Sequence, residues 1–177
     1  MSILVVRHAS AGTRLIDGGD DADRPLDRNG ALQAVSIADA FADRAVSTVL
    51  SSRAVRCQQT VSPLAQRAGL TVGVSAALFE GESFGAVRLV NGMAEADDDD
   101  QTTVLCSHGD VVSEIVRSLA LSGMRTGGDK GCAKGSVWEL ICSNGAVIEG
   151  HYHRPPSRWS YAKPADYARA SVLDRHS

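Results

Sequence analysis

Short apolar runs alternate along this chain with segments in which apolar residues recur at helical spacing. The runs favour β-strands and the recurring positions favour amphipathic helices. In chain order the pattern predicts a strand at 2–7, a helix at 30–44, a strand at 46–50, a helix at 54–68, a strand at 72–74, a helix at 84–96, a strand at 102–107 and a helix at 111–119. Strands that alternate with helices are typical of parallel sheets covered on both faces. We therefore expect an α/β fold, a three-layer α/β/α sandwich with a mainly parallel central sheet.

Turn-forming and charged residues separate these elements. Loops are predicted at 9–28, 97–100 and 123–135, where glycine or aspartate is frequent. Asp27 is expected to cap the first helix, and Pro63 to kink the second helix or shorten its first half. Near the end of the chain, two strands flank Asn144-Gly145, a pair that favours a type I′ hairpin turn.

Length and composition favour a single compact domain, because the 177 residues are 44% hydrophobic and 22% charged. We expect this domain to span residues 1–153 and residues 154–177, which are rich in proline, to form a C-terminal tail. The net charge of −3 disfavours nucleic acid as a partner. Apolar stretches fall short of the roughly 18 residues that a membrane span needs, and the N-terminal run is too short for a signal peptide. A cytoplasmic protein without a membrane partner is expected.

Cysteine and histidine spacings do not indicate metal or redox chemistry. The cysteines form no C-x-x-C pair, so free packed thiols are expected at Cys57, Cys106, Cys132 and Cys142. His151 and His153 alternate onto one face of a predicted strand, but no third ligand lies near them in the sequence, and we interpret them as a surface pair. We expect neither a metal ion nor another cofactor.

Basic and imidazole side chains follow two of the predicted strands at the ends where α/β sheets place their chemistry. Arg7 and His8 end the first strand, and His108 follows the strand at 102–107. If these strands are parallel neighbours, the three side chains converge at one edge of the sheet. Arg53 and Arg56 lie near the start of a helix, where backbone N–H groups also attract anions. An imidazole beside guanidinium groups indicates nucleophilic attack on a phosphoryl group.

Several motifs in this order resemble the histidine phosphatase superfamily, also called the phosphoglycerate mutase-like superfamily. They are Arg7-His8-Ala9, which stands where the family has Arg-His-Gly, the stretch from Ser51-Ser52 through Arg56 to Thr60, Ser107-His108-Gly109, and Asp23-Arg24-Pro25-Leu26-Asp27 with Gly30. The segment Lys134-Gly135-Ser136-Val137-Trp138 looks most like the histidine-phosphatase half of actinobacterial MutT-type two-domain proteins. SixA-type phosphohistidine phosphatases are the next most similar group. The resemblance implies a phosphoglycerate mutase-like fold and a histidine phosphatase domain at 1–153.

The resemblance also implies roles for individual residues. His8 would be the nucleophile that becomes phosphohistidine, and Arg7, Arg56 and His108 would bind the transferred phosphoryl group. Fixed donors aimed at the phosphoryl oxygens stabilise the charge that they carry during transfer. His8 must attack as the neutral imidazole, and a hydrogen bond from its other nitrogen to a backbone carbonyl would fix the tautomer. The activity implied is a metal-independent phosphatase that works in two steps.

A general acid for the leaving group is less clearly marked in the sequence. In many family members a Glu after the third strand supplies the proton, and Glu80 fits that pattern best. Glu82 lies two residues further on, and SixA-type members work without such an acid. The three alternatives remain open at this stage. A catalytic Glu80 favours phosphate esters or nucleotide phosphates as substrates, whereas its absence favours phosphohistidine.

Substrate contacts beyond the phosphoryl group are predicted for Ser10, Arg14, Arg53 and Lys134. The expected partner is a small phosphorylated molecule, with nucleotides included. A phosphohistidine protein is the alternative substrate, and a phosphate-sensing or partner-binding protein of low turnover is the alternative function. A deep pocket roofed by residues 10–24 and 123–135 would favour small molecules, and a shallow open one would favour a protein substrate.

Overall fold

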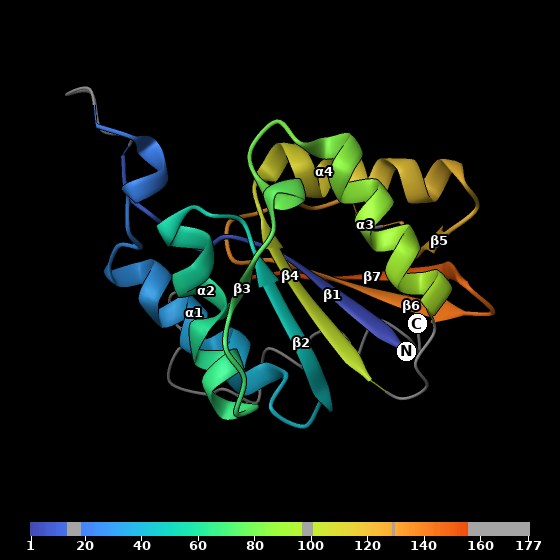
Figure 1. Ribbon diagram of the computed structural model, residues 1–177, viewed down its shortest axis with the longest axis horizontal. Coiled ribbons are helices and arrows are strands. Elements are labelled where there is room, and N and C mark those ends of the chain that lie inside the picture. The colour runs from blue at the N-terminus through green and yellow to red at the C-terminus, as the bar shows by residue number, and fades with distance from the viewer. Residues whose placement is uncertain (14–18, 97–100, 129, 156–177) are drawn as a thin grey trace.

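The computed structural model describes residues 1–13, 19–96, 101–128 and 130–155 (Figure 1). Its strands are β1 (Ser2–Arg7), β2 (Val46–Ser51), β3 (Gly73–Val74), β4 (Thr102–Ser107), β5 (Arg125–Thr126), β6 (Val137–Ser143) and β7 (Ala146–His153). Its α-helices are α1 (Arg28–Ala40), α2 (Val55–Arg67), α3 (Ser83–Ala96) and α4 (Gly109–Leu121), and two short 3₁₀ helices are η1 (Asp21–Asp23) and η2 (Ala76–Leu78).

The strands form one sheet in the order β3-β2-β4-β1-β6-β7-β5. The neighbours β3, β2, β4 and β1 are parallel, and β5 is parallel to β7. Among the described strands, only β6 runs against its neighbours, with antiparallel pairing to β1 and β7. The mainly parallel sheet is confirmed. The pairing of β1 with β4 sets Arg7 opposite Ser107, so the strand ends that carry the two histidines lie side by side.

Helices cover both faces of this sheet, which confirms the three-layer α/β/α arrangement. Leu4 and Val6 of β1 point into the core cluster formed with α1 and α2. Ile3 and Val5 point to the other face, into the cluster formed with α3 and α4. Figure 1 shows the two helix pairs on opposite sides of the strands. β1 is continuously apolar because it is buried on both faces, and each such side chain contributes roughly 1.5–3 kcal/mol on burial.

The predicted cap at Asp27 is confirmed, and it also holds the loop that follows His8. One carboxylate oxygen of Asp27 accepts from the backbone N–H of Gly30 at 2.7 Å. The other accepts from the Ser10 hydroxyl at 2.6 Å and from the Gly12 N–H at 2.9 Å. The helix begins at Arg28, earlier than predicted, because this cap fixes its first turn.

The hairpin between β6 and β7 is also confirmed. Asn144 and Gly145 both have positive φ, 52° and 76°, as a type I′ turn requires. Three expectations differ from the structure. Pro63 does not shorten α2, which runs unbroken from Val55 to Arg67 against the sheet. The predicted loop at 123–135 contains β5, and the loop at 9–28 contains η1.

His153 differs from the surface residue that was expected. It is 6% exposed, and its Nε2 lies 2.9 Å from a carboxylate oxygen of Glu139, itself 3% exposed. The second Glu139 oxygen accepts from Arg44 at 2.5 Å. The pairing of β6 with β7 places His153 opposite Val137 in the register, and this long-range contact cannot be read from the His151-x-His153 spacing.

Some expectations concern residues that are not described. The predicted loop at 97–100 and all but the first two residues of the predicted tail at 154–177 lie outside the described residues. Within residues 1–13, 19–96, 101–128 and 130–155, no helix is long and apolar enough to cross a membrane. The same residues contain no group of three or more His, Cys, Asp or Glu side chains suited to hold a metal ion.

Candidate active site

His8 and His108 meet at the ends of two adjacent parallel strands. His8 follows β1 and donates its backbone N–H to the Ser107 carbonyl at 2.9 Å, and His108 follows β4. The two imidazole rings lie 5.5 Å apart between centroids at an interplanar angle of 66°. The convergence that the strand pattern predicted is therefore present in the structure.

His8 is held as a neutral imidazole with one nitrogen engaged. Its Nδ1 lies 2.8 Å from the carbonyl oxygen of Ala9, so the ring proton sits on Nδ1 and Nε2 keeps its lone pair. Burial lowers the pKa of His8 to about 3, although the hydrogen bond to Ala9 opposes the shift. The charges of Arg56, His108 and Arg7 lower this pKa further. The unprotonated Nε2 is suited to act as a nucleophile.

Arg56 extends from the first turn of α2 into the same site and is 2% exposed. Its Nη1 donates to the Asp21 carbonyl at 2.6 Å and lies 3.3 Å from the Asp21 carboxylate. Its Nη2 lies 3.5 Å from a carboxylate oxygen of Glu80. Its Nε is buried and has no hydrogen-bond partner among the described residues. Such a buried guanidinium is a ready partner for phosphoryl oxygens.

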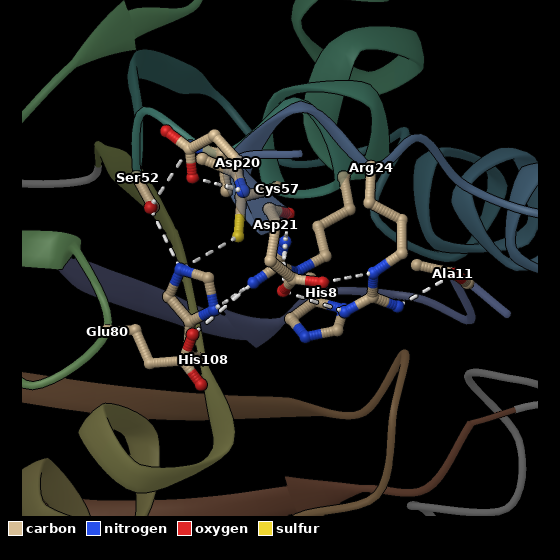
Figure 2. Close-up of polar contacts among 12 residues, drawn as sticks. His8, Ala11, Asp20, Asp21, Arg24, Ser52, Cys57, Glu80 and His108 are labelled. Atoms are coloured by element: carbon tan, nitrogen blue, oxygen red, sulfur yellow. Dashed lines mark hydrogen bonds and ion pairs between the residues drawn. The ribbon is translucent and has the colours of Figure 1, made fainter. Parts of the chain in front are cut away.

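The ring of His108 is engaged at both nitrogens (Figure 2). Arg56 Nη2 donates to Nδ1 at 3.3 Å, because the guanidinium has no lone pair to accept with. The proton of His108 is therefore on Nε2, which lies 2.9 Å from the Ser52 hydroxyl oxygen and 3.6 Å from the Cys57 sulfur. Figure 2 shows Ser52 and Cys57 together on that side of the ring.

The four cysteines are free, as expected, but Cys57 does more than fill the core. A hydrogen bond with Cys106 and the neighbouring His108 lower the pKa of the Cys57 thiol, and burial opposes this shift. Neither Cys57 nor Ser52 was predicted to contact His108. The only signal in the sequence was the position of both residues within the Ser51–Thr60 motif.

Arg7 also lines the site, and its surroundings explain why residue 109 is a glycine. Its Nη1 donates to the carbonyl of Cys132, and its Nε has no hydrogen-bond partner among the described residues. A Cβ at Gly109 would lie 2.9 Å from Cζ of Arg7. Glycine at 109 therefore leaves room for the guanidinium beside the start of α4.

These side chains surround a cavity of about 450 Å³. Arg7, His8, Glu80 and His108, all predicted from the sequence, line it together with Gly109, Asp110, Ser113 and Cys132. Arg56 lies behind this wall and reaches it through His108 and Glu80. No sequence signal marked Asp110, Ser113 or Cys132 as cavity residues, because their place on the wall depends on how α4 and the segment around Cys132 pack.

The two candidate acids lie in different places. Glu80 lines the cavity, and its side chain is 41% exposed. Glu82 is not among the lining residues; its backbone N–H donates to the Phe79 carbonyl at 3.0 Å, and its own carbonyl accepts from Ala86. The position of Glu80 makes it the better candidate of the two.

Ser10, Arg53 and Lys134, the described members of the predicted substrate-binding set, are not among the residues that line the cavity. Ser10 binds the carboxylate of Asp27, as described above. Arg53 lies 4.2 Å above the ring of Phe79 and 3.3 Å from the Asp20 carboxylate. Lys134 is exposed, and its carbonyl accepts from Gln33. Arg14 lies outside the described residues.

Comparison with known proteins adds a family and several relatives. The family model described as the histidine phosphatase superfamily (branch 1) matches residues 3–88. The 8-oxo-(d)GTP phosphatase of Mycolicibacterium smegmatis is 31% identical over 157 residues, which are 88% of this chain. The match covers 48% of that relative, so the chain spans about half of its length.

Solved structures of similar fold include two SixA proteins. A protein described as a candidate phosphohistidine phosphatase SixA from Agrobacterium tumefaciens is 25% identical, with a TM-score of 0.62, over 80% of this chain and 91% of its own. The protein histidine phosphatase SixA in complex with tungstate is 20% identical, with a TM-score of 0.65, over 94% of this chain and 99% of its own. The second likeness concerns the fold alone. The names of these relatives are consistent with the two branches that the sequence resemblance indicated.

Proposed function

Because the chain belongs to the histidine phosphatase superfamily, we propose that it hydrolyses phosphomonoesters or nucleotide phosphates through a phosphohistidine intermediate on His8. The observation that carries the proposal is the state of His8. Its Nδ1 proton is held by the Ala9 carbonyl, and its Nε2 is left unprotonated at the wall of a cavity shared with Arg7 and His108.

In the first step, Nε2 of His8 attacks the substrate phosphorus in line with the leaving oxygen. The N–P bond forms as the P–O bond breaks, and Glu80 in its acid form gives a proton to the departing oxygen. General acid catalysis of this kind is worth roughly 10²–10⁴-fold. The location of Glu80 on the cavity wall with His8 supports this role.

In the second step, water attacks the phosphohistidine and the P–N bond breaks, which releases inorganic phosphate. Glu80, now a carboxylate, takes the proton from this water, and His8 returns to its neutral form. The same group thus serves as acid and then as base, and the site is ready for another cycle. Because both displacements are in line, the water enters from the side on which the leaving group departed, so one carboxyl group can serve both steps.

Arg7 and Arg56 bind the phosphoryl group through both steps, and His108 joins them when its Nδ1 carries a proton and donates to a phosphoryl oxygen. The Nε atoms of the two arginines have no hydrogen-bond partner among the described residues, and phosphoryl oxygens can accept from them, which supports this role. Fixed donors of this kind are worth roughly 3–4 kcal/mol each in the transition state. Because these donors stabilise the negative charge on the phosphoryl oxygens directly, the proposed mechanism needs no metal ion or other cofactor.

The volume of the cavity supports a small phosphorylated substrate, because ligand pockets for small molecules typically measure roughly 300–1,000 Å³. Cys132 brings one part of the 123–135 segment to its wall. The relative named 8-oxo-(d)GTP phosphatase supports nucleotides within this class. We place the activity in residues 1–153 and the protein in the cytoplasm, with no nucleic acid or membrane as partner.

A SixA-type phosphohistidine phosphatase is the second candidate function. The observation that favours it is the 25% identity over most of the chain to the Agrobacterium tumefaciens protein. A phosphohistidine substrate presents nitrogen as the leaving atom, which takes up a proton more readily than an ester oxygen does. This alternative therefore depends less on Glu80, and a protein that senses phosphate with low turnover depends on it least.

Phosphate release from the purified protein tests these candidates. The substrates are p-nitrophenyl phosphate, nucleoside di- and triphosphates, sugar phosphates and a phosphohistidine peptide, all with EDTA present. His8→Ala is the test variant, and Arg117→Ala, an exposed change on α4, is the matched control. We expect release that survives EDTA and Arg117→Ala but is lost in His8→Ala. Release no greater than that of His8→Ala would contradict the proposed function and favour the sensing protein.

A further inference from the structure

We propose that Asp110 is a positioning residue that orients Glu80 over the cavity. The proposal rests on the function proposed above, because it concerns the delivery of the proton to the leaving group. Glu80 belongs to the segment 79–82, which joins η2 to α3 and is called the acid loop below. The inference concerns how this exposed loop is held at the active site.

Two hydrogen bonds attach the acid loop region to the junction of β4 and α4, one on each side of Glu80. Before Glu80, the buried hydroxyl of Ser107 donates to the Leu78 carbonyl at 2.6 Å. After Glu80, the backbone N–H of Gly81 donates to a carboxylate oxygen of Asp110 at 2.9 Å. The same junction carries His108, so the two attachments tie the candidate acid to the phosphoryl-binding histidine.

The geometry of the acid loop explains why the second attachment matters. Glu82 N–H donates to the Phe79 carbonyl at 3.0 Å, and Gly81 has a φ of +88°. These features match a type II turn with Glu80 and Gly81 at its two central positions. In such a turn the N–H of the third residue is not used within the turn. Asp110 takes up this N–H and thereby fixes the peptide plane that directly follows Glu80.

The place of Asp110 in the fold suits it to this task. It is the second residue of α4, where the positive end of the helix dipole favours a carboxylate. Its bond to the Gly81 N–H is charge-assisted, which makes it stronger than a bond between neutral groups. Asp110 also lines the cavity. A negative charge there repels a phosphate group, so a role in binding substrate directly is unfavourable, and a role in positioning accounts for the carboxylate.

Two substrates with different leaving groups test the proposal. Nitrophenolate leaves readily from p-nitrophenyl phosphate without a proton, whereas phenol leaves from phenyl phosphate only with one. The measurement is kcat/KM for each substrate in the full chain, which reports the steps up to transfer onto His8. The variants are Glu80→Gln, Asp110→Ala and Asp110→Asn. Asn keeps an oxygen that accepts from Gly81 and removes the charge.

We expect Asp110→Ala to lower kcat/KM for phenyl phosphate about tenfold to 100-fold and to leave that for p-nitrophenyl phosphate within about threefold. Glu80→Gln should show the same selectivity, and Asp110→Asn should restore the wild-type ratio of the two substrates. Circular dichroism and urea unfolding of each variant check that the fold is retained.

Other results would overturn the inference. Equal changes in KM for both substrates in Asp110→Ala and Asp110→Asn would mean that the charge acts on the substrate. Selective loss in both variants would make Asp110 itself the acid. If Glu80→Gln lowers kcat/KM selectively for phenyl phosphate but Asp110→Ala keeps the wild-type ratio of the two substrates, Asp110 does not position Glu80, and the proposed function still stands. If Glu80→Gln lowers kcat/KM equally for both substrates, the assignment of Glu80 as the acid in the proposed function has failed.

Discussion

The two histidines of the site stand at equivalent places on neighbouring parallel strands, yet the protein holds their rings in different ways. His8 uses only Nδ1, which bonds to the carbonyl of the next residue, and Nε2 is left for chemistry. His108 is engaged at both nitrogens, by Arg56 on one side and Ser52 on the other. We propose that these different partners give two identical side chains different roles, His8 that of the nucleophile and His108 that of a fixed ligand.

Variants that lack one of the two imidazole rings should show the largest losses of activity, and the losses should differ between the two. We expect His8→Ala to lower turnover by on the order of 10⁴-fold or more, because no other group replaces the attacking nitrogen. His108→Ala should lower kcat/KM by roughly 10²–10³-fold, the typical loss of one transition-state donor. Phosphate release from p-nitrophenyl phosphate measures both. Equal losses in the two variants would contradict the division of roles.

The low pKa of His8 predicts a smaller effect, on stability. Folded His8 has a pKa of about 3, and the unfolded chain has the ordinary histidine value of 6.5, so between these values only the unfolded state takes up the proton. Because of His8, the free energy of unfolding therefore falls by up to about 1.4 kcal/mol per pH unit as the pH is lowered from about 6.5 toward 3. Urea unfolding at several pH values should show that the free energy of unfolding of His8→Ala falls less than that of the wild type as the pH is lowered. Parallel curves for the two proteins would argue against a neutral buried His8.

The smallest effect should come from a change that touches only one of the two rings. Ser52→Ala removes the partner of His108 Nε2 and leaves the contact between His8 and Ala9 in place. One hydrogen bond is worth about 0.5–1.5 kcal/mol, so kcat/KM should fall roughly threefold to tenfold. Ser52→Thr, which keeps the hydroxyl, is the matched control. A loss as large as that of His108→Ala would mean that Ser52 acts in the chemistry itself.

The sequence predicted the parts of this molecule that depend on local pattern and on strand direction. The apolar runs marked the strands, and the parallel sheet then brought Arg7, His8 and His108 together. The cap at Asp27 and the turn at Asn144-Gly145 were also correct, because their residue types act through local backbone geometry.

Contacts between distant segments could not be predicted in the same way. Asp21 reaches Arg56 because η1 folds back over α2, and nothing in the Gly/Asp-rich loop specifies that return. His153 lies buried beside Glu139 of the paired strand, and this contact depends on the register of β6 with β7. Pro63 is tolerated inside α2 because the packing of that helix against the sheet outweighs the local cost of proline.

The most direct test of the central claim is to trap the phosphorylated protein. Substrate labelled with ³²P is mixed with the full chain, the reaction is stopped in alkali, and the tryptic peptide His8–Arg14 is analysed by mass spectrometry. The account predicts phosphate on His8 that is stable in alkali, labile in acid and absent from His8→Ala. Acid-stable phosphate on Ser10 or Thr13 of that peptide, or phosphate release with no labelled protein, would contradict it.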